Sequence, residues 1–226
     1  MKKLNCKLQI ANCKLQLVIG ALAAFFVLAA PVSARTILIT DEDCDDMAVI
    51  SEDTPLLSWA MYDSSPGVLS TYMISFNPKR AVLIRYPLDK IPRGQRITSA
   101  EWTVPLTYVS GSPHLEVRRM LANWGMGVCH KYAKTSPKKV KWSKPGGRGI
   151  SSDRALKATA KKKVTEAKTL VFNVTEDVEL WYSGGAANNG WILTDEDEGI
   201  CYFSCPISPW VPGKGLWKLR ITYEPK

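Results

Sequence analysis

The chain has 226 residues, including 30 lysines and arginines against 21 aspartates and glutamates, which gives a formal net charge of +9. This length is enough for one domain with a sizeable core. Four of the lysines lie within the first 14 residues, and the remaining positive charge is too small to indicate nucleic-acid binding by itself.

The first 34 residues predict a secretory signal peptide. Basic residues precede an almost uninterrupted apolar run at residues 15–30, and Val32-Ser33-Ala34 predicts cleavage after Ala34. A retained membrane anchor is the alternative, although the run is shorter than the roughly 20 residues of a typical span. We therefore expect residues 35–226 to form a single domain, secreted or at the cell surface, with no membrane span once the signal is removed.

Strands separated by turns are expected through the rest of the chain. An apolar run at residues 81–86, flanked by Pro78 and Pro87, predicts a buried strand. Residues 216–223 alternate polar and apolar side chains, which predicts a strand with one wet face. The same signals predict strands at 46–50, 97–108, 115–120, 170–172, 191–194 and 202–204. This pattern favours an all-β antiparallel sandwich of the jelly-roll type.

One short helix is expected at Thr175–Trp181, because Val174, Val178 and Trp181 recur at helical spacing. Thr175 could cap its start and Gly184 could end it. Asn173-Val174-Thr175 is also a glycosylation sequon, which we interpret as the end of a strand followed by a helix cap.

Residues 132–168 lack a clear strand or helix period and contain few apolar side chains. They predict a long basic surface loop, partly mobile, of the kind that is either functional or disordered. Its cations are Lys138, Lys139, Lys141, Lys144, Arg148, Arg154, Lys157, Lys161, Lys162, Lys163 and Lys168.

The ordered set of these signals resembles a known family. The matching segments are residues 81–89 (AVLIRYPLD), 91–94 (IPRG), 97–102 (ITSAEW), 172–175 (FNVT), 189–193 (NGWIL) and 219–223 (LRITY). They are similar to the DNRLRE domain, also described as the disaggregatase-related or family 96 carbohydrate-binding module, over most of residues 46–223. The resemblance implies a secreted β-sandwich that binds polysaccharide or belongs to the cell envelope.

Three tryptophans on predicted loops, Trp124, Trp142 and Trp210, are candidates for stacking on a sugar ring. Packing beneath the loop is the alternative for each of them. Trp102, Trp181, Trp191 and Trp217 occupy periodic positions and are expected in the core.

The surroundings of Trp142 suit an acidic polysaccharide. Lys141 and Arg148 lie nearby in sequence, and a cationic surface attracts a polyanion while a guanidinium can grip a carboxylate. Single-stranded nucleic acid would suit the same surface, but an exported protein is not expected to meet it. A solubilising loop is the alternative interpretation.

Acidic runs at residues 41–46 and 195–198 could supply oxygen ligands for a structural calcium ion, with Asp45, Asp46 and Asp195 as candidates. Solvated surface charge is the alternative. The runs do not place two carboxylates across a cleft, as a glycosidase requires, and neither histidine comes with a nucleophile motif. We therefore expect no catalytic residues and no enzyme activity.

Four cysteines follow the signal, and an even number in an exported chain suggests two disulfides among Cys44, Cys129, Cys201 and Cys205. Cys201 and Cys205 would stand about 13 Å apart in a strand, too far for a bond to each other. Each is expected to pair with a distant partner or to remain a thiol.

The sequence thus predicts a secreted, non-catalytic carbohydrate-binding domain for an acidic polysaccharide. A structural or assembly protein of the cell envelope is the alternative.

Overall fold

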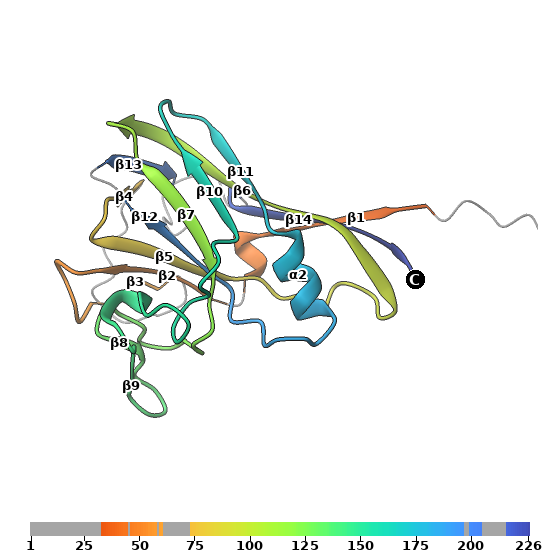
Figure 1. The fold of residues 1–226 in the computed structure, drawn as a ribbon, viewed down its shortest axis with the longest axis horizontal. Helices are drawn as coiled ribbons and strands as arrows, with labels where there is room; N and C mark the ends of the chain where they lie inside the picture. Colours follow the sequence, from red (N-terminus) through yellow and green to blue (C-terminus); the bar gives the residue numbers. More distant parts are fainter. Residues whose placement is uncertain (1–32, 45, 58, 61–72, 197–198, 205–215) are drawn as a thin grey trace, which may run out of the picture. The chain divides into compact units, whose positions relative to one another are not determined.

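The computed structural model describes residues 33–226 except residues 45, 58, 61–72, 197–198 and 205–215. Residues 34–226 form one compact unit. Most of this unit is built from antiparallel strands with one short α-helix, so the predicted all-β class is confirmed (Figure 1).

Two six-stranded sheets make up the body of the domain. In sheet A the strand order is β1-β14-β6-β13-β4, and β11 also pairs with β6. Its strands are β1 (Arg35–Thr40), β4 (Met73–Phe76), β6 (Gln95–Ser110), β11 (Thr169–Asn173), β13 (Ile200–Ser204) and β14 (Lys218–Pro225). In sheet B the order is β10-β7-β12-β5-β2-β3. Its strands are β2 (Asp46–Ser51), β3 (Trp59–Ala60), β5 (Arg80–Arg85), β7 (His114–Arg119), β10 (Ala160–Lys163) and β12 (Trp191–Asp195).

Sheet A follows the alternation expected of a sheet with one face in the core. Trp102, Val104 and Leu106 on β6 are buried, as are Leu219 and Ile221 on β14, as the sequence pattern predicted. The residues between them are exposed or half-buried. This period of two places the inner face of sheet A against sheet B.

Aromatic rings fill the space between the two sheets. Trp102 stacks on Trp191 with ring centroids 5.9 Å apart, and it contacts Trp217 and Phe172 at 5.8 and 5.7 Å. Trp181 approaches Trp191 at 4.6 Å. The four tryptophans at periodic positions are therefore all buried, and the prediction that they form the core is confirmed.

Sheet B is buried on both faces. β2, β5 and β12 are almost entirely buried, and their outward side chains Ala48, Ile50, Leu83 and Ile192 belong to a second apolar cluster. Residues 120–159, the outer layer, cover this face and contribute the other members of the cluster, Met120, Trp124, Val128, Ala133 and Trp142. Continuous apolar runs are typical of strands covered on both sides, which explains why these strands show no alternation.

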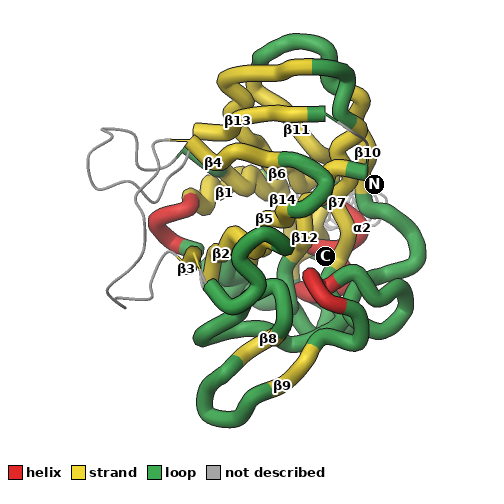
Figure 2. Tube along the Cα trace, turned by 90° about the vertical axis from the view of Figure 1, so that its left-hand side faces the viewer, coloured by secondary structure: helices red, strands yellow, loops and turns green. Residues whose placement is uncertain are grey.

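The outer layer contains a small two-stranded sheet, β8 (Tyr132–Lys134) and β9 (Val140–Lys141), and the 3-10 turn η2 (Pro145–Gly147). Another 3-10 turn in the described residues, η1 (Asp41–Asp43), follows β1. Figure 2 shows β8 and β9 below β2 and β5. The prediction of a surface loop at 132–168 is wrong in this respect: the segment includes the buried residues Trp142, Asp153 and Val164, and it closes with strand β10.

Helix α2 (Thr175–Tyr182) lies close to the predicted range, but Val174 and not Thr175 occupies the N-cap position. The Thr175 hydroxyl accepts from the backbone N–H of Ala100 and donates to Asn173 Oδ1, at 2.9 and 2.7 Å. Gly184 follows the helix with a φ of 79°, which glycine adopts readily. None of the helices in the described part of the chain has the length and apolarity needed to cross a membrane.

Candidate functional site

A buried carboxylate organises the outer layer. Asp153 Oδ1 accepts from the backbone N–H of Ser143 at 2.9 Å, and Oδ2 accepts from the N–H groups of Lys144 and Gly149 at 3.0 Å each. These three hydrogen bonds satisfy acceptor oxygens that burial removes from water. A side chain at Gly149 would clash, because its Cβ would lie 1.9 Å from Ser143 Oγ. The turn at residues 143–153 is thus closed around one side chain.

The two described loop tryptophans anchor the outer layer to sheet B. Trp142 and Trp124 are only 5% and 2% exposed. Trp142 Nε1 donates to the carbonyl of Cys129 at 2.8 Å, and Trp124 Nε1 donates to the carbonyl of Asn189 at 2.7 Å. The expectation that these indoles offer exposed faces to a sugar is therefore wrong, because the apolar outer face of sheet B takes both of them. Trp210 lies outside the described residues.

The cations of the outer layer form one basic surface. Between Met120 and Asp153 the chain has seven lysines and arginines and no acidic residue. The basic surface, as defined here, consists of six lysines on or beside the β8–β9 hairpin: Lys131, Lys134, Lys138, Lys139, Lys141 and Lys144. All of them are exposed except Lys134, which is half-buried, and within the described residues none pairs with a carboxylate. The Nζ atoms of Lys131 and Lys139 lie 5.9 and 5.8 Å from the ring centre of Tyr132.

Arg148 and Lys141, the two predicted cationic site residues, have different surroundings. Lys141 is exposed on β9 as part of the basic surface. Arg148 is half-buried, and its Nη2 donates to the carbonyl of Pro78 in the turn before β5. Arg148 thus fastens the outer layer to a neighbouring turn, and its guanidinium is only partly available to a ligand.

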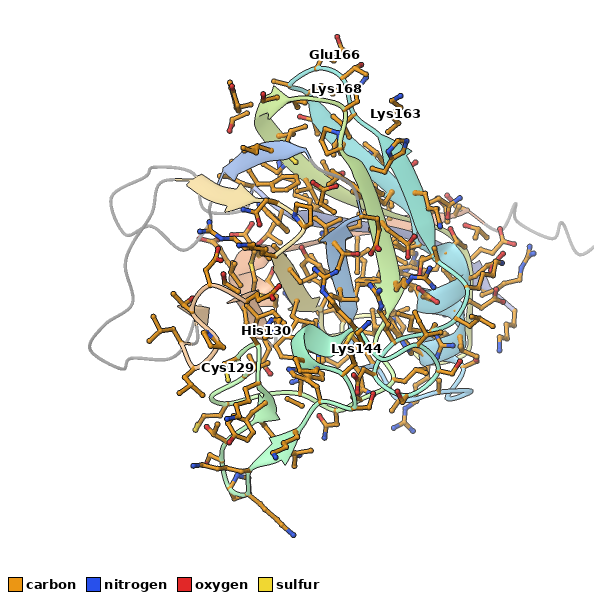
Figure 3. All side chains as sticks on the ribbon, turned by 60° about the vertical axis from the view of Figure 1, so that its left-hand side comes forward. Cys129, His130, Lys144, Lys163, Glu166 and Lys168 are labelled. Atoms are coloured by element: carbon orange, nitrogen blue, oxygen red, sulfur yellow. The ribbon has the colours of Figure 1, made fainter. Side chains whose placement is uncertain are left out.

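His130 follows Cys129 in the outer layer, just before β8 (Figure 3). Its carbonyl accepts from the N–H of Gly146 at 2.6 Å. Burial lowers the pKa of the imidazole below 6.5, and the charge of Arg148 acts in the same direction against the opposing charge of Glu52. The folded outer layer therefore favours the neutral histidine.

The predicted calcium ligands are not brought together. Asp46 forms an ion pair with Arg85, Asp195 is fully buried on β12, and Asp45 lies outside the described residues. No group of three or more histidines, cysteines, aspartates or glutamates in the described ranges could hold a metal ion. The described residues therefore offer no geometry for the predicted calcium site.

The described cysteines do not form the predicted disulfides. Cys44, Cys129 and Cys201 are all buried and no disulfide links them, while Cys205 lies outside the described residues. Cys129 lies in the outer layer, where its carbonyl accepts from Trp142 Nε1, whereas Cys44 and Cys201 belong to the core between the sheets. Burial, with a contribution from Asp195, raises the pKa of Cys201 to about 12, so its thiol stays protonated.

A second feature is a cleft of about 690 Å³ beside the start of α2. Its lining residues come from β6, the end of β7, the loop at 155–159, the end of β11 and the first turn of α2. Asp177 lines the cleft and contacts three neighbouring side chains. Its Oδ2 accepts from Thr159 Oγ1 and Trp191 Nε1 at 2.6 and 2.8 Å, and its Oδ1 lies 3.2 Å from Arg119 Nε.

Sequence reasoning missed Arg119 and Asp177, because their partners are distant in the chain and no spacing motif connects them. The adjacent pair Arg118-Arg119 on a strand was an available signal, since neighbouring residues there point to opposite faces. The structure separates them accordingly, with Arg118 paired to Glu116 and Arg119 paired to Asp177.

No family model matches the chain, and no curated protein matches it either.

Proposed function

We propose that this protein binds an acidic polysaccharide, without converting it chemically, through the basic surface of the outer layer. The observation that carries the proposal is the charge of this layer: seven lysines and arginines and no acidic residue lie between Met120 and Asp153. Six of these cations are gathered on and beside one hairpin. Such a concentration of one sign attracts a chain of the opposite sign over long range.

The basic surface has a fixed foundation. Asp153 accepts hydrogen bonds from the backbone of Ser143 and Lys144. Trp142, which directly follows β9, packs against the outer face of sheet B and donates to the carbonyl of Cys129. The lysines are therefore carried by an ordered backbone, which lowers the conformational entropy lost when a polymer binds. Binding of a polyanion would also relieve the repulsion among neighbouring ammonium groups.

Lysines confer a particular kind of recognition. An ammonium group is a strongly hydrated point charge, whereas a guanidinium recognises a carboxylate with two parallel hydrogen bonds. A surface made of lysines therefore favours charge density over a precise ligand geometry. We expect binding to weaken strongly as salt is added, because exposed charges are screened within about 8–10 Å at physiological ionic strength.

The resemblance to the DNRLRE domain supports this proposal because it implies polysaccharide binding, and the predicted signal peptide supports it because it implies export. The role of aromatic residues is revised. Trp124 and Trp142 support the outer layer from below, and Tyr132, which is half-buried between two lysines, is the aromatic residue that belongs to the basic surface.

Affinity gel electrophoresis in polygalacturonate and in neutral dextran tests the proposal. We expect polygalacturonate alone to retard the protein, with an effect that salt abolishes. The variant K138Q/K139Q/K141Q/K144Q should bind about tenfold more weakly, since four exposed ion pairs of a few tenths of a kcal/mol each sum to about 1.4 kcal/mol.

The matched control is K163Q/K168Q/K218Q/K226Q, which removes the same charge from exposed lysines outside the outer layer. It should be retarded almost as strongly as the native protein. Equal weakening of both variants would mean that net charge and not the basic surface is responsible. Absence of retardation of the native protein would reject the proposal and favour the envelope-assembly alternative.

A further inference from the structure

The cleft beside α2 contains donors that the fold does not use. Arg119 lines the cleft and is held through Nε by Asp177, and its side chain is 21% exposed. Within the described residues Nη1 and Nη2 of Arg119 have no hydrogen-bond partner. The guanidinium is thus oriented by a buried carboxylate while its outer edge remains available.

Asp177 and Arg119 form an ion pair without net charge, so the outer edge of the guanidinium offers hydrogen-bond donors and not a surplus of positive charge. Its two oxygens take hydrogen bonds from Thr159 and Trp191 and the ion pair with Arg119. A carboxylate with three such partners is stabilised in place and has little remaining capacity to repel a ligand. Asp177 acts as a positioning residue for Arg119.

A second unused donor lies across the cleft at Asn173. Asn173 Oδ1 accepts from both the N–H and the hydroxyl of Thr175, at 3.0 and 2.7 Å. This fixes the amide group, and within the described residues its Nδ2 has no hydrogen-bond partner. At the rim Lys157 pairs with Glu176 at 3.0 Å, but both side chains are highly exposed, so this pair contributes little and can exchange partners.

We propose that this cleft binds a single carboxylated sugar unit, a uronate, with its carboxylate on the Arg119 Nη edge and a hydroxyl on Asn173 Nδ2. The inference rests on the proposed function, because it assigns a specific subsite for one unit of the acidic polysaccharide. The apolar groups of Ala155, Ala158 and Leu180 also line the cleft and suit the C–H face of a sugar. The volume lies within the range of about 300–1,000 Å³ that is usual for small-ligand sites.

The charges of the cleft favour a carboxylate over a phosphate or sulfate. Arg119 and Lys157 are balanced by Asp177 and Glu176, so the pocket has no surplus of positive charge to neutralise a dianion. The recognition that remains is geometric, because two parallel N–H groups of a guanidinium match the two oxygens of a planar carboxylate. This differs from the basic surface, where lysines supply charge without such a fork.

Titration calorimetry with a galacturonate trisaccharide tests the subsite in the full-length protein. Arg119→Lys keeps the positive charge beside Asp177 but removes the fork, and we expect about tenfold weaker binding. Asn173→Asp keeps the acceptor for Thr175 while replacing the free donor with a carboxylate, and it should weaken binding at least as much. The methyl-esterified trisaccharide, which lacks the charge, should bind the native protein weakly.

Arg85→Lys is the matched control, because it makes the same change at an arginine of similar exposure that pairs with Asp46 on β2 and does not line the cleft. Native affinity in this variant and an unchanged melting temperature in all three variants support the subsite. Unchanged affinity of Arg119→Lys, or equal weakening by Arg85→Lys, overturns it. Displacement of the trisaccharide by equimolar inorganic phosphate also overturns it.

This experiment is independent of the one that tests the basic surface. A trisaccharide that occupies the cleft should bind K138Q/K139Q/K141Q/K144Q with native affinity, although that variant binds the polymer about tenfold more weakly. Loss of trisaccharide binding in the lysine variant would overturn the cleft as the site of recognition while leaving the basic surface intact as a proposal. Undiminished polymer binding by K138Q/K139Q/K141Q/K144Q, together with trisaccharide binding that depends on Arg119, would reject the basic surface and keep the cleft.

Discussion

The two faces of sheet B are covered in different ways. On the inner face Trp191 and Leu193 pack against the aromatic side chains of sheet A. On the outer face Ile192 and its neighbours are covered by a segment with little regular secondary structure, fixed by the carboxylate of Asp153 and the indole N–H groups of Trp124 and Trp142. Apolar packing between sheets defines the domain, whereas the outer layer depends on a few polar contacts.

This difference explains why the outer layer can carry a binding surface. Buried side chains that face sheet B fix the backbone of the outer layer. The exposed side chains are therefore not needed for the fold and can bind a ligand. Loops on a rigid scaffold are where binding residues commonly occur. A tryptophan in a lysine-rich loop can therefore pack against the sheet beneath the loop, although the same sequence context is expected of a tryptophan that stacks on a sugar.

The largest expected effect lies in the core between the sheets. Trp102→Ala removes a fully buried indole that contacts three other aromatic rings. We expect a loss of about 3–5 kcal/mol in the free energy of unfolding, measured by urea denaturation. Both layers should lose stability together, and a loss confined to the outer layer would contradict the division described above.

A smaller, local effect is expected from Asp153→Asn. The amide retains one acceptor oxygen, so it cannot satisfy all the N–H groups of Ser143, Lys144 and Gly149. We expect a loss of about 1.5–3 kcal/mol. Hydrogen exchange should accelerate at these three amides and not in β6. Asp43→Asn, at an exposed ion pair with Lys90, is the control and should have little effect.

Trp142→Phe tests the support role of the indole more gently. It keeps most of the apolar contact but removes the hydrogen bond to the carbonyl of Cys129. The cost should be about 1 kcal/mol, and retardation by polygalacturonate should persist. Complete loss of polymer binding with an intact fold would instead restore Trp142 as a contact residue.

The smallest effect concerns pH. Because folding lowers the pKa of His130, the unfolded chain binds a proton more readily below pH 6.5, and stability should fall as the pH decreases from that value. His130→Gln should flatten this dependence, whereas His114→Gln, the control at the other histidine, should preserve it. Urea denaturation at pH 7 and at pH 5, followed through outer-layer amides, measures the difference. An unchanged slope in His130→Gln would assign the dependence to other groups.

Period and composition were sufficient for much of the fold. They located β2, β5, β6, β7, β11, β12, β13, β14 and α2 to within a few residues, because each has a regular apolar pattern or clear turn signals. β1 was missed, although Ile37 and Ile39 alternate with polar or exposed residues, because it follows directly on the predicted signal. β8, β9 and β10 are short and rich in lysine, so they lack the apolar period on which strand prediction depends.

The candidate site was less predictable, for a physical reason. Four of the six lysines of the basic surface were identified from the sequence because charge density is local, whereas Lys131 and Lys134 at its start were not. The burial of Trp124 and Trp142 was not, because it depends on an apolar sheet face contributed by strands 40 to 100 residues away in the chain. The same holds for Arg119 and Asp177, which are 58 positions apart and meet only in the folded domain.

The pairing of the first and last strands has a mechanical consequence. β1 and β14 run antiparallel, with Arg35 opposite Tyr223, so the outer ends of both strands emerge side by side (Figure 1). Tension applied between these two ends would load their hydrogen bonds one after another, as in a zipper, and not all at once in shear. The strand pair should therefore peel open at low force.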